Sequence, residues 1–175
     1  EFRIFIINDE VVGILHRVPA NVTGDGVLNI GQLIDRKNED PLRGKGYRTP
    51  LEKIRKGREE EMFLKQQGMD FNTVPKEGEV VYLRENSNIS TGGDSIDFTD
   101  DIDDSYKAIA VEAAKALNVK ITGRDMMIQD IHAPATPDNY AIIEMNFNPA
   151  IHIHCYPFKG KNRHLNHKMI RALGF

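Results

Sequence analysis

The chain has 175 residues, of which 40% are hydrophobic and 28% charged, a composition typical of one globular domain with a hydrophobic core. Its formal net charge of -3 argues against a nucleic-acid-binding surface. No apolar run reaches the roughly 18 residues that a membrane-spanning helix needs, and no signal-peptide pattern is present. The single Cys155 cannot form an internal disulfide, which is compatible with a reducing compartment, so we expect a soluble, cytoplasmic protein.

The first seven residues predict a strand. Its even positions are apolar and form one face, whereas Glu1 and Arg3 lie on the other. No initiator Met or lead-in precedes the strand, so we expect the chain to begin inside a domain whose earlier part is missing. If the missing part holds a nucleotide, Glu1 and Arg3 would lie beside that nucleotide. Both are therefore candidate cofactor-binding residues. A solvated strand face is the alternative.

A turn at residues 8–10 and a returning strand at 11–17 complete a hairpin. Arg17 stands where this strand meets a loop rich in Gly and Asp. The forked donors of an arginine at such a corner suit a phosphate or a carboxylate. Arg17 is therefore a candidate site residue, with a solvated surface arginine as the alternative.

Residues 26–78 predict a helical insertion in the sheet. Helical spacing marks 29–37, a Thr N-cap followed by Pro starts a helix at 49–55, and a third helix at 59–67 ends at Gly68. Charged side chains crowd these helices, and solvated faces explain most of them.

The sheet resumes at residues 79–84 and brings Arg84 to the head of a polar loop, 85–94. The glycines of this loop allow a ligand to approach the backbone closely, although a Gly-Gly pair is more often a plain turn. An arginine beside such a loop suits a transferring phosphoryl group or an acyl phosphate. Arg84 is thus a candidate catalytic residue. The candidate substrate-binding residues of the loop are Asn86, Ser90, Thr91, Gly92 and Gly93.

Acidic residues at 100–104 indicate a helix N-terminus, since acids there oppose the helix dipole. The Ala-rich run 105–117 predicts a helix that ends at Asn118, and a short closing helix is expected at 168–173. The face expected to be buried on the Ala-rich helix carries Ile109, Ala113 and Ala116.

Two further strands, 119–128 and 141–148, are expected to form an antiparallel hairpin. Ala141, Ile142 and Ile143 predict a buried strand, and Pro149 ends the ladder. Glu144 and Asn146 leave the same strand face, and pairing would bring Asp125 beside them. Such oxygen ligands suit one or two Mg²⁺ or Mn²⁺ ions. The alternative is that these are separate polar residues on edge strands.

Several blocks of the chain together resemble a known family, the bifunctional glutamate-cysteine ligase/glutathione synthetase, in the C-terminal part of its ATP-grasp module. Cyanophycin synthetase shares the general pattern and is the nearest alternative. The resemblance covers nearly the whole chain. Its blocks are Arg17–Gly26, Asp40–Tyr47, Leu83–Asp94, Gly123–Asp125, Ile142–Pro149 and His152–Pro157.

The resemblance implies an α+β fold: the C-terminal lobe of an ATP-grasp domain, a mainly antiparallel sheet with packed helices and an insertion at 26–78. All of 1–175 would be part of that domain. It also implies a ligase that uses ATP and a pair of Mg²⁺ or Mn²⁺ ions to convert a carboxylate to an acyl phosphate, which an amine attacks. For glutathione synthetase the acid is gamma-glutamylcysteine and the amine is glycine; a homodimer is compatible with this assignment.

Under this resemblance each candidate residue takes a role. The metal ligands would be Asp125, Glu144 and Asn146. Arg84, assisted by Arg17, would stabilise the phosphoryl group. Asn148, His152 and His154 would line the acceptor side. One feature departs from the family: the earlier lobe, with its phosphate-binding lysines, is absent, and no Walker A pattern replaces it.

The histidines offer a rival interpretation, a zinc-binding hydrolase. A strand would place His152 and His154 on one face, and a helix would place His164 and His167 on one face, near Cys155. No His-Glu-x-x-His or paired Cys-x-x-Cys motif supports it. A non-catalytic binding module is the third class.

Overall fold

The computed structural model describes all 175 residues. They form two compact units, one made of Glu1–His16 with Ser95–Phe175 and the other of Arg17–Asp94. The expected insertion at 26–78 lies within the second unit. No helix is long and apolar enough to cross a membrane.

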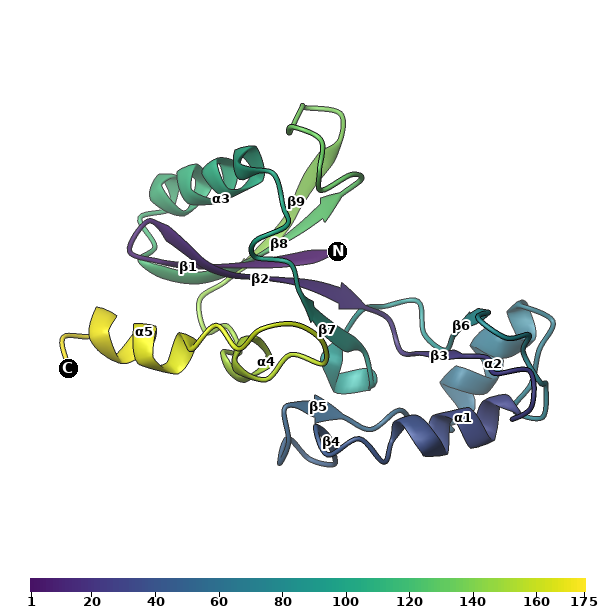
Figure 1. Ribbon diagram of the computed structural model, residues 1–175. Helices are drawn as coiled ribbons and strands as arrows, with labels where there is room; N and C mark the ends of the chain where they lie inside the picture. The colour runs from purple at the N-terminus through teal and green to yellow at the C-terminus, as the bar shows by residue number, and fades with distance from the viewer. The chain divides into compact units, whose positions relative to one another are not determined.

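The first unit is built on a five-stranded sheet in the order β7-β2-β1-β8-β9 (Figure 1). The pairs β1 with β2, β1 with β8, and β8 with β9 are antiparallel. The predicted α+β class, with a mainly antiparallel sheet and packed helices, is confirmed. The strands are β1 (Phe2–Ile7), β2 (Glu10–Val18), β7 (Asp94–Asp97), β8 (Ile121–Ile128) and β9 (Tyr140–Asn146).

The first hairpin forms as predicted. Asn8 and Asp9 have φ angles of 47° and 64°, which these two residue types tolerate better than most and which a tight hairpin turn requires. Ile7 and Glu10 are then register partners. The turn chemistry therefore fixes the pairing of β1 with β2.

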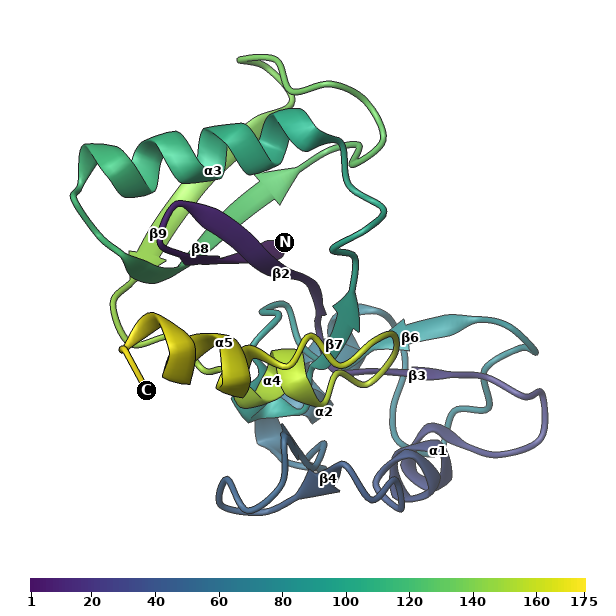
Figure 2. The same cartoon turned by 60° about the vertical axis from the view of Figure 1, so that its left-hand side comes forward.

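Helices cover both faces of the sheet (Figures 1 and 2). One face carries α3 (Asp104–Ala116), and the other carries α4 (His152–Cys155) and α5 (Leu165–Ala172). Because side chains alternate along a strand, the even positions of β1 pack under α3, while Phe5 and Ile7 pack with residues of α4 and α5. The second face of β1 was expected to be polar, and this is wrong after Arg3. Phe5 and Ile7, which continue that face, belong to the hydrophobic core.

The Ala-rich helix is confirmed, but its predicted face is only partly buried: Ile109 packs against the core, whereas Ala116 is exposed. The Asp103 side chain caps α3 by accepting a hydrogen bond from the Ser105 backbone N-H. The buried residues are Tyr106, Ala110 and Ala114. Tyr106 determines this face because its large ring is fully buried. Ala110 and Ala114 follow it at four-residue spacing, so they lie on the same side of the helix.

The prediction that the first residues of β9 are buried is wrong. Ala141 is exposed, and Ile142 and Ile143 are 44% and 53% exposed, because β9 is the edge strand of the sheet. The register also shifts here: Asp125 faces Glu144 and Met126 faces Ile142, so the ladder skips Ile143.

The histidine segment is not a strand. His152–Cys155 forms the single helical turn α4, so His152 and His154 do not share a strand face.

The closing helix α5 is longer than predicted and begins at Leu165. Asn118 and Gly174 each follow a helix with a positive φ, of 51° and 89°, one residue beyond the helix cap.

The second unit contains two small sheets and two helices. It buries a core of its own that includes Ile30, Ile34, Leu64 and Leu83. The sheets pair β3 (Asn21–Thr23) with β6 (Val80–Tyr82) antiparallel and β4 (Arg43–Gly44) with β5 (Leu51–Glu52) parallel. The helices are α1 (Ile30–Lys37) and α2 (Arg58–Gln66), and a 3-10 turn, η1, spans Ile89–Thr91.

Two of the three helices predicted in this unit are confirmed. Asn29 and Gln32 form a reciprocal capping box at the start of α1. Gly68, with φ of 73°, follows the end of α2. The helix predicted at 49–55 is wrong, because Thr49 donates its hydroxyl to the Leu51 carbonyl and the Asn38 amide holds the Ile54 backbone in extended form.

His154 makes the stability of the protein sensitive to acid. Its side chain is fully buried against the Phe5 ring, with ring centroids 5.3 Å apart, and burial lowers its pKa to about 3. The unfolded chain binds a proton at this ring near the ordinary pKa of about 6.5, whereas the folded chain does not. Stability from this group is therefore present above pH ~6.5 and is lost as the pH falls towards 3.

We expect the free energy of unfolding to fall by up to about 1.4 kcal/mol per pH unit from this residue between pH 6 and pH 4. Urea denaturation at intervals across this range measures it. His154→Gln removes the ionisable ring and should flatten the slope by up to one proton. An unchanged slope in that variant would contradict the assignment.

Candidate functional site

The three predicted metal ligands lie together on the β8-β9 ladder of the first unit. Asp125 and Glu144 are direct register partners, so their side chains leave the same face of the sheet. Asn146 follows two residues later on that face and donates its side-chain N-H to Glu144 Oε1 at 3.0 Å. The hairpin geometry thus gathers two carboxylates and an amide.

Arg3 completes this cluster from the neighbouring strand β1, where it is the register partner of Asp125. Its Nε and Nη2 each donate to one Asp125 oxygen at 2.6 Å, and Nη2 lies 3.8 Å from Glu144 Oε1. The Asp125 side chain is 2% exposed, that of Arg3 11% and that of Glu144 56%. Arg3 therefore neutralises a buried carboxylate, while Glu144 faces solvent.

These residues fit a hard divalent cation. Mg²⁺ is commonly held by one or two carboxylates, with waters and substrate phosphates in its other positions. The chain has no group of three or more His, Cys, Asp or Glu side chains that could hold a metal, so the oxygen of Asn146 would have to contribute. The Asp125 carboxylate would have to bind both Arg3 and the ion. The Glu144 carboxylate is exposed and can bind the ion directly.

The segment after β9 folds back against the sheet. A Cβ at Gly123 would lie 2.8 Å from Pro149 Cβ, so this position of β8 admits no side chain. Asn148 and His152 are exposed, and either side chain can reach a ligand. His154 is fully buried, so the structure does not support the expectation that it lines an acceptor site.

Arg84, in the second unit, is held at the first turn of α2. Its Nε donates to Glu60 Oε1 at 2.6 Å, and Nη1 is paired with Glu59. Burial and the charge of Arg55 lower the pKa of Arg84. Glu60 is 1% exposed and Glu59 71% exposed, so the first partner is fixed and the second is open to solvent.

The two loop glycines pack against the protein itself. Gly92 has φ of 95°, and a Cβ on it would lie 2.8 Å from Ile54 Cα. A Cβ on Gly93 would lie 2.8 Å from the Val18 carbonyl oxygen. Both are buried, so the close approach that requires glycine is to the chain's own backbone and not to an open ligand site.

The polar side chains of the same loop are more accessible. Asn86 is exposed, and Ser90 and Thr91 are half-buried. Thr91 Oγ1 donates to Asn86 Oδ1 at 3.0 Å, which orders this part of the loop. Arg17, at the end of β2, is 9% exposed, and Glu1 is half-buried.

The loop ends in a buried polar cluster that the sequence interpretation did not identify. Asp94 is 4% exposed and is paired with Arg43 and with Lys37, whose Nζ lies 2.7 Å away. Asn21 donates to the same carboxylate at 3.0 Å. Most of the charged side chains on these helices were expected to face solvent, but Lys37 belongs to this cluster. Burial lowers the pKa of Lys37, and the negative charge of Asp94 acts in the opposite direction.

The histidines do not assemble a zinc site. His164 and His167 stack with ring centroids 5.8 Å apart, but His154 is buried and no group of potential ligands surrounds them. The hydrolase alternative therefore lacks a ligand set.

Comparison with known proteins shows which proteins the chain is similar to. No family model matches the chain. It is 66% identical over 175 residues to the glutathione biosynthesis bifunctional protein GshAB of Desulfotalea psychrophila, and 60% identical over 173 residues to that of Clostridium perfringens. The crystal structure of a bifunctional glutathione synthetase from Pasteurella multocida matches 98% of the chain at 46% identity, with a TM-score of 0.88.

The chain is homologous to part of the bifunctional glutathione biosynthesis proteins. It covers 22% of the length of the two curated relatives and 24% of the crystallised chain. The predicted resemblance is confirmed over the whole chain, and so is the fold that it implies.

We predict that Arg3→Met lowers the free energy of unfolding by about 3 kcal/mol, because it leaves the Asp125 carboxylate buried without a counter-ion. Chemical denaturation measures the loss. Arg3→Met/Asp125→Leu should recover much of it, since the unpaired charge is then gone.

Lys65→Met provides the control for the Arg3 variant. It breaks the exposed pair with Glu61 on α2, whose nitrogen and oxygen are 2.7 Å apart, and should cost less than about 1 kcal/mol. Equal losses in Arg3→Met and Lys65→Met would show that the Arg3 pair is not a buried anchor.

Proposed function

We propose that this chain supplies the metal-binding strands and a substrate loop of an ATP-dependent carboxylate-amine ligase, a glutathione synthetase that joins gamma-glutamylcysteine to glycine. The observation that carries the proposal is the cluster of Asp125, Glu144 and Asn146 on adjacent strands. The names of its relatives support the same reaction. A ligase of the cyanophycin synthetase type remains the second candidate, to be separated by substrate.

Within this proposal the metal site depends on strand geometry. A divalent ion, when bound, neutralises phosphate charge and so favours transfer of the phosphoryl group to the acid. Glu144 and Asn146 would hold it from the edge strand. Arg3, which binds both oxygens of the buried Asp125, would fix the orientation of that carboxylate beside the ion.

The second unit would supply the arginines and the polar loop. Arg84 can keep its Nε bond to buried Glu60 and exchange only the exposed Glu59 for an oxyanion, and Arg17 would assist it. Asn86, Ser90 and Thr91 would contact substrate, with Gly92 and Gly93 shaping the loop. In the first unit, Asn148 and His152 would contact the acceptor.

The metal proposal is tested in the full-length ligase with Glu144→Gln and Asn146→Ala. We expect ATP turnover to fall by at least a hundredfold in each variant, while circular dichroism and the thermal midpoint stay near those of the parent. Asp138→Asn removes an exposed acid from the β8-β9 connection and should leave turnover within twofold. Near-normal turnover of either site variant at saturating Mg²⁺ would refute the proposed site.

Arg84→Lys tests the phosphoryl role, because lysine keeps the charge but loses the fork that holds Glu60 and a ligand together. We expect kcat to fall at least tenfold, and by more than KM rises. Glu59→Gln removes only the exchangeable partner and should leave kcat within twofold. If Arg84→Lys changed KM for the amine alone, Arg84 would be an acceptor-binding residue instead.

A further inference from the structure

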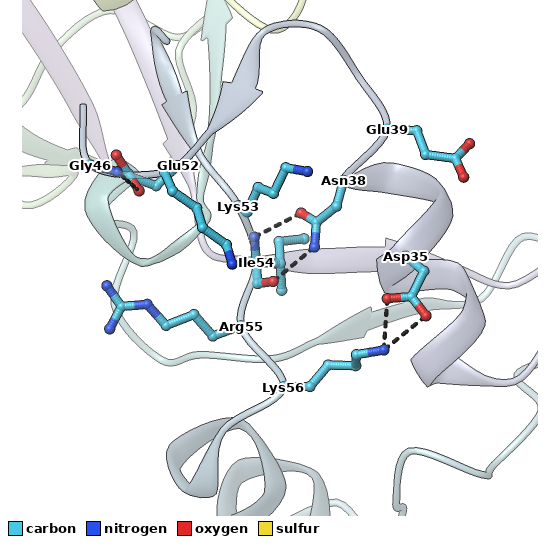
Figure 3. Close-up of a pocket in the computed structure, with 10 residues that line it drawn as sticks. Asp35, Asn38, Glu39, Gly46, Glu52, Lys53, Ile54, Arg55 and Lys56 are labelled. Carbon is cyan, nitrogen blue, oxygen red and sulfur yellow. Dashed lines mark hydrogen bonds and ion pairs between the residues drawn. The ribbon is translucent and has the colours of Figure 1, made fainter. Parts of the chain in front are cut away.

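A cavity of about 660 Å³ opens in the second unit, between the C-terminal end of α1 and the segment around β5 (Figure 3). Pockets of this size hold small molecules. None of the candidate ligase residues lines it. Its lining residues are Asp35, Asn38, Glu39, Lys45, Gly46, Glu52, Lys53, Ile54, Arg55 and Lys56.

Three of the charged groups in this cavity already have partners. Lys56 Nζ contacts both oxygens of Asp35, at 2.6 and 2.8 Å. The Glu52 carboxylate is buried and accepts hydrogen bonds from the backbone N-H groups of Gly46, at 3.2 Å, and Tyr47, at 2.5 Å. These contacts account for one cation and two acids of the lining.

The charges that remain are mostly positive. Lys45, Lys53 and Arg55 line the same cavity, and Glu39 is the acid left to oppose them. Figure 3 shows Arg55 pointing away from the pair formed by Lys56 and Asp35. Arg55 also lies close enough to Arg84 for its charge to lower the Arg84 pKa, after the larger effect of burial. An excess of cations around one cavity attracts an anion.

The backbone that carries these cations is fixed. The Asn38 side chain accepts from the Ile54 N-H and donates to the Ile54 carbonyl, each at 2.8 Å, as a neighbouring strand would. Ile54 is 3% exposed and anchors the segment in the core. Lys53 and Arg55 therefore project from an ordered, extended segment, so that a ligand would not have to order the chain.

We propose that this cavity is a binding site for a small polyanion, a molecule carrying at least two carboxylate or phosphate groups. Lys45 and Lys53 act as point charges, and Arg55 supplies a fork that matches one oxyanion group. The proposal does not rest on the ligase assignment, because none of the candidate ligase residues lines the cavity.

Isothermal titration of the protein with two probes tests this site. Pyrophosphate represents phosphate ligands and citrate represents carboxylate ligands, each in low-salt buffer. We expect at least one to bind with a submillimolar Kd that weakens as salt is added. Tighter binding of pyrophosphate would assign the site to phosphate compounds, and tighter binding of citrate to polycarboxylates.

Lys53→Gln/Arg55→Gln should weaken binding of the better probe at least tenfold. The matched control, Lys65→Gln/Lys115→Gln, removes the same net charge from exposed ion pairs on α2 and α3 and should change Kd by less than twofold. Thermal melting confirms that both variants fold. Failure of both probes to bind, or equal weakening in the two double variants, would overturn the proposal.

Discussion

The ion pair of Arg3 with Asp125 is the interaction on which the proposed metal site depends. The two residues are 122 positions apart, and the contact joins the first strand of the chain to the strand that carries the acids. A charged carboxylate that is 2% exposed is costly to bury without a counter-charge, and Arg3 supplies that charge to Asp125. Glu144, which needs no such partner, is left available to an ion.

The second unit meets the same constraint with different residues. Asp94 is nearly as buried as Asp125 and is matched by Arg43 and Lys37, from β4 and α1. Because Asp94 directly follows Gly93, this pairing fixes the end of the polar loop. In both units a buried acid holds together segments that are distant in sequence, and the accessible polar groups lie beside it.

The sequence predicted the features that depend on local rules. Alternation identified β1, turn residues identified its hairpin, and the i, i+2 spacing placed Glu144 and Asn146 on one face. It failed where tertiary contacts decide. The Thr-Pro helix signal at Thr49 lost to the extended pairing of β5, and the exposure of Ile143 depended on β9 being an edge strand. Arg3 was expected to lie beside a nucleotide or to face solvent, and its pairing with Asp125 was missed because alternation does not show what covers a strand face.

Net charge, likewise, averages over sites of opposite sign. The overall value of -3 argues against a nucleic-acid-binding surface, yet the segment from Arg43 to Arg58 contains one acid among a run of lysines and arginines. That acid, Glu52, accepts hydrogen bonds from backbone N-H groups. Lys45, Lys53 and Arg55 of the same segment line the cavity. The first unit directs carboxylates outward at Glu144, and the second directs cations into its pocket. The two clusters therefore attract groups of opposite charge, each over a distance of only about 10 Å in physiological salt.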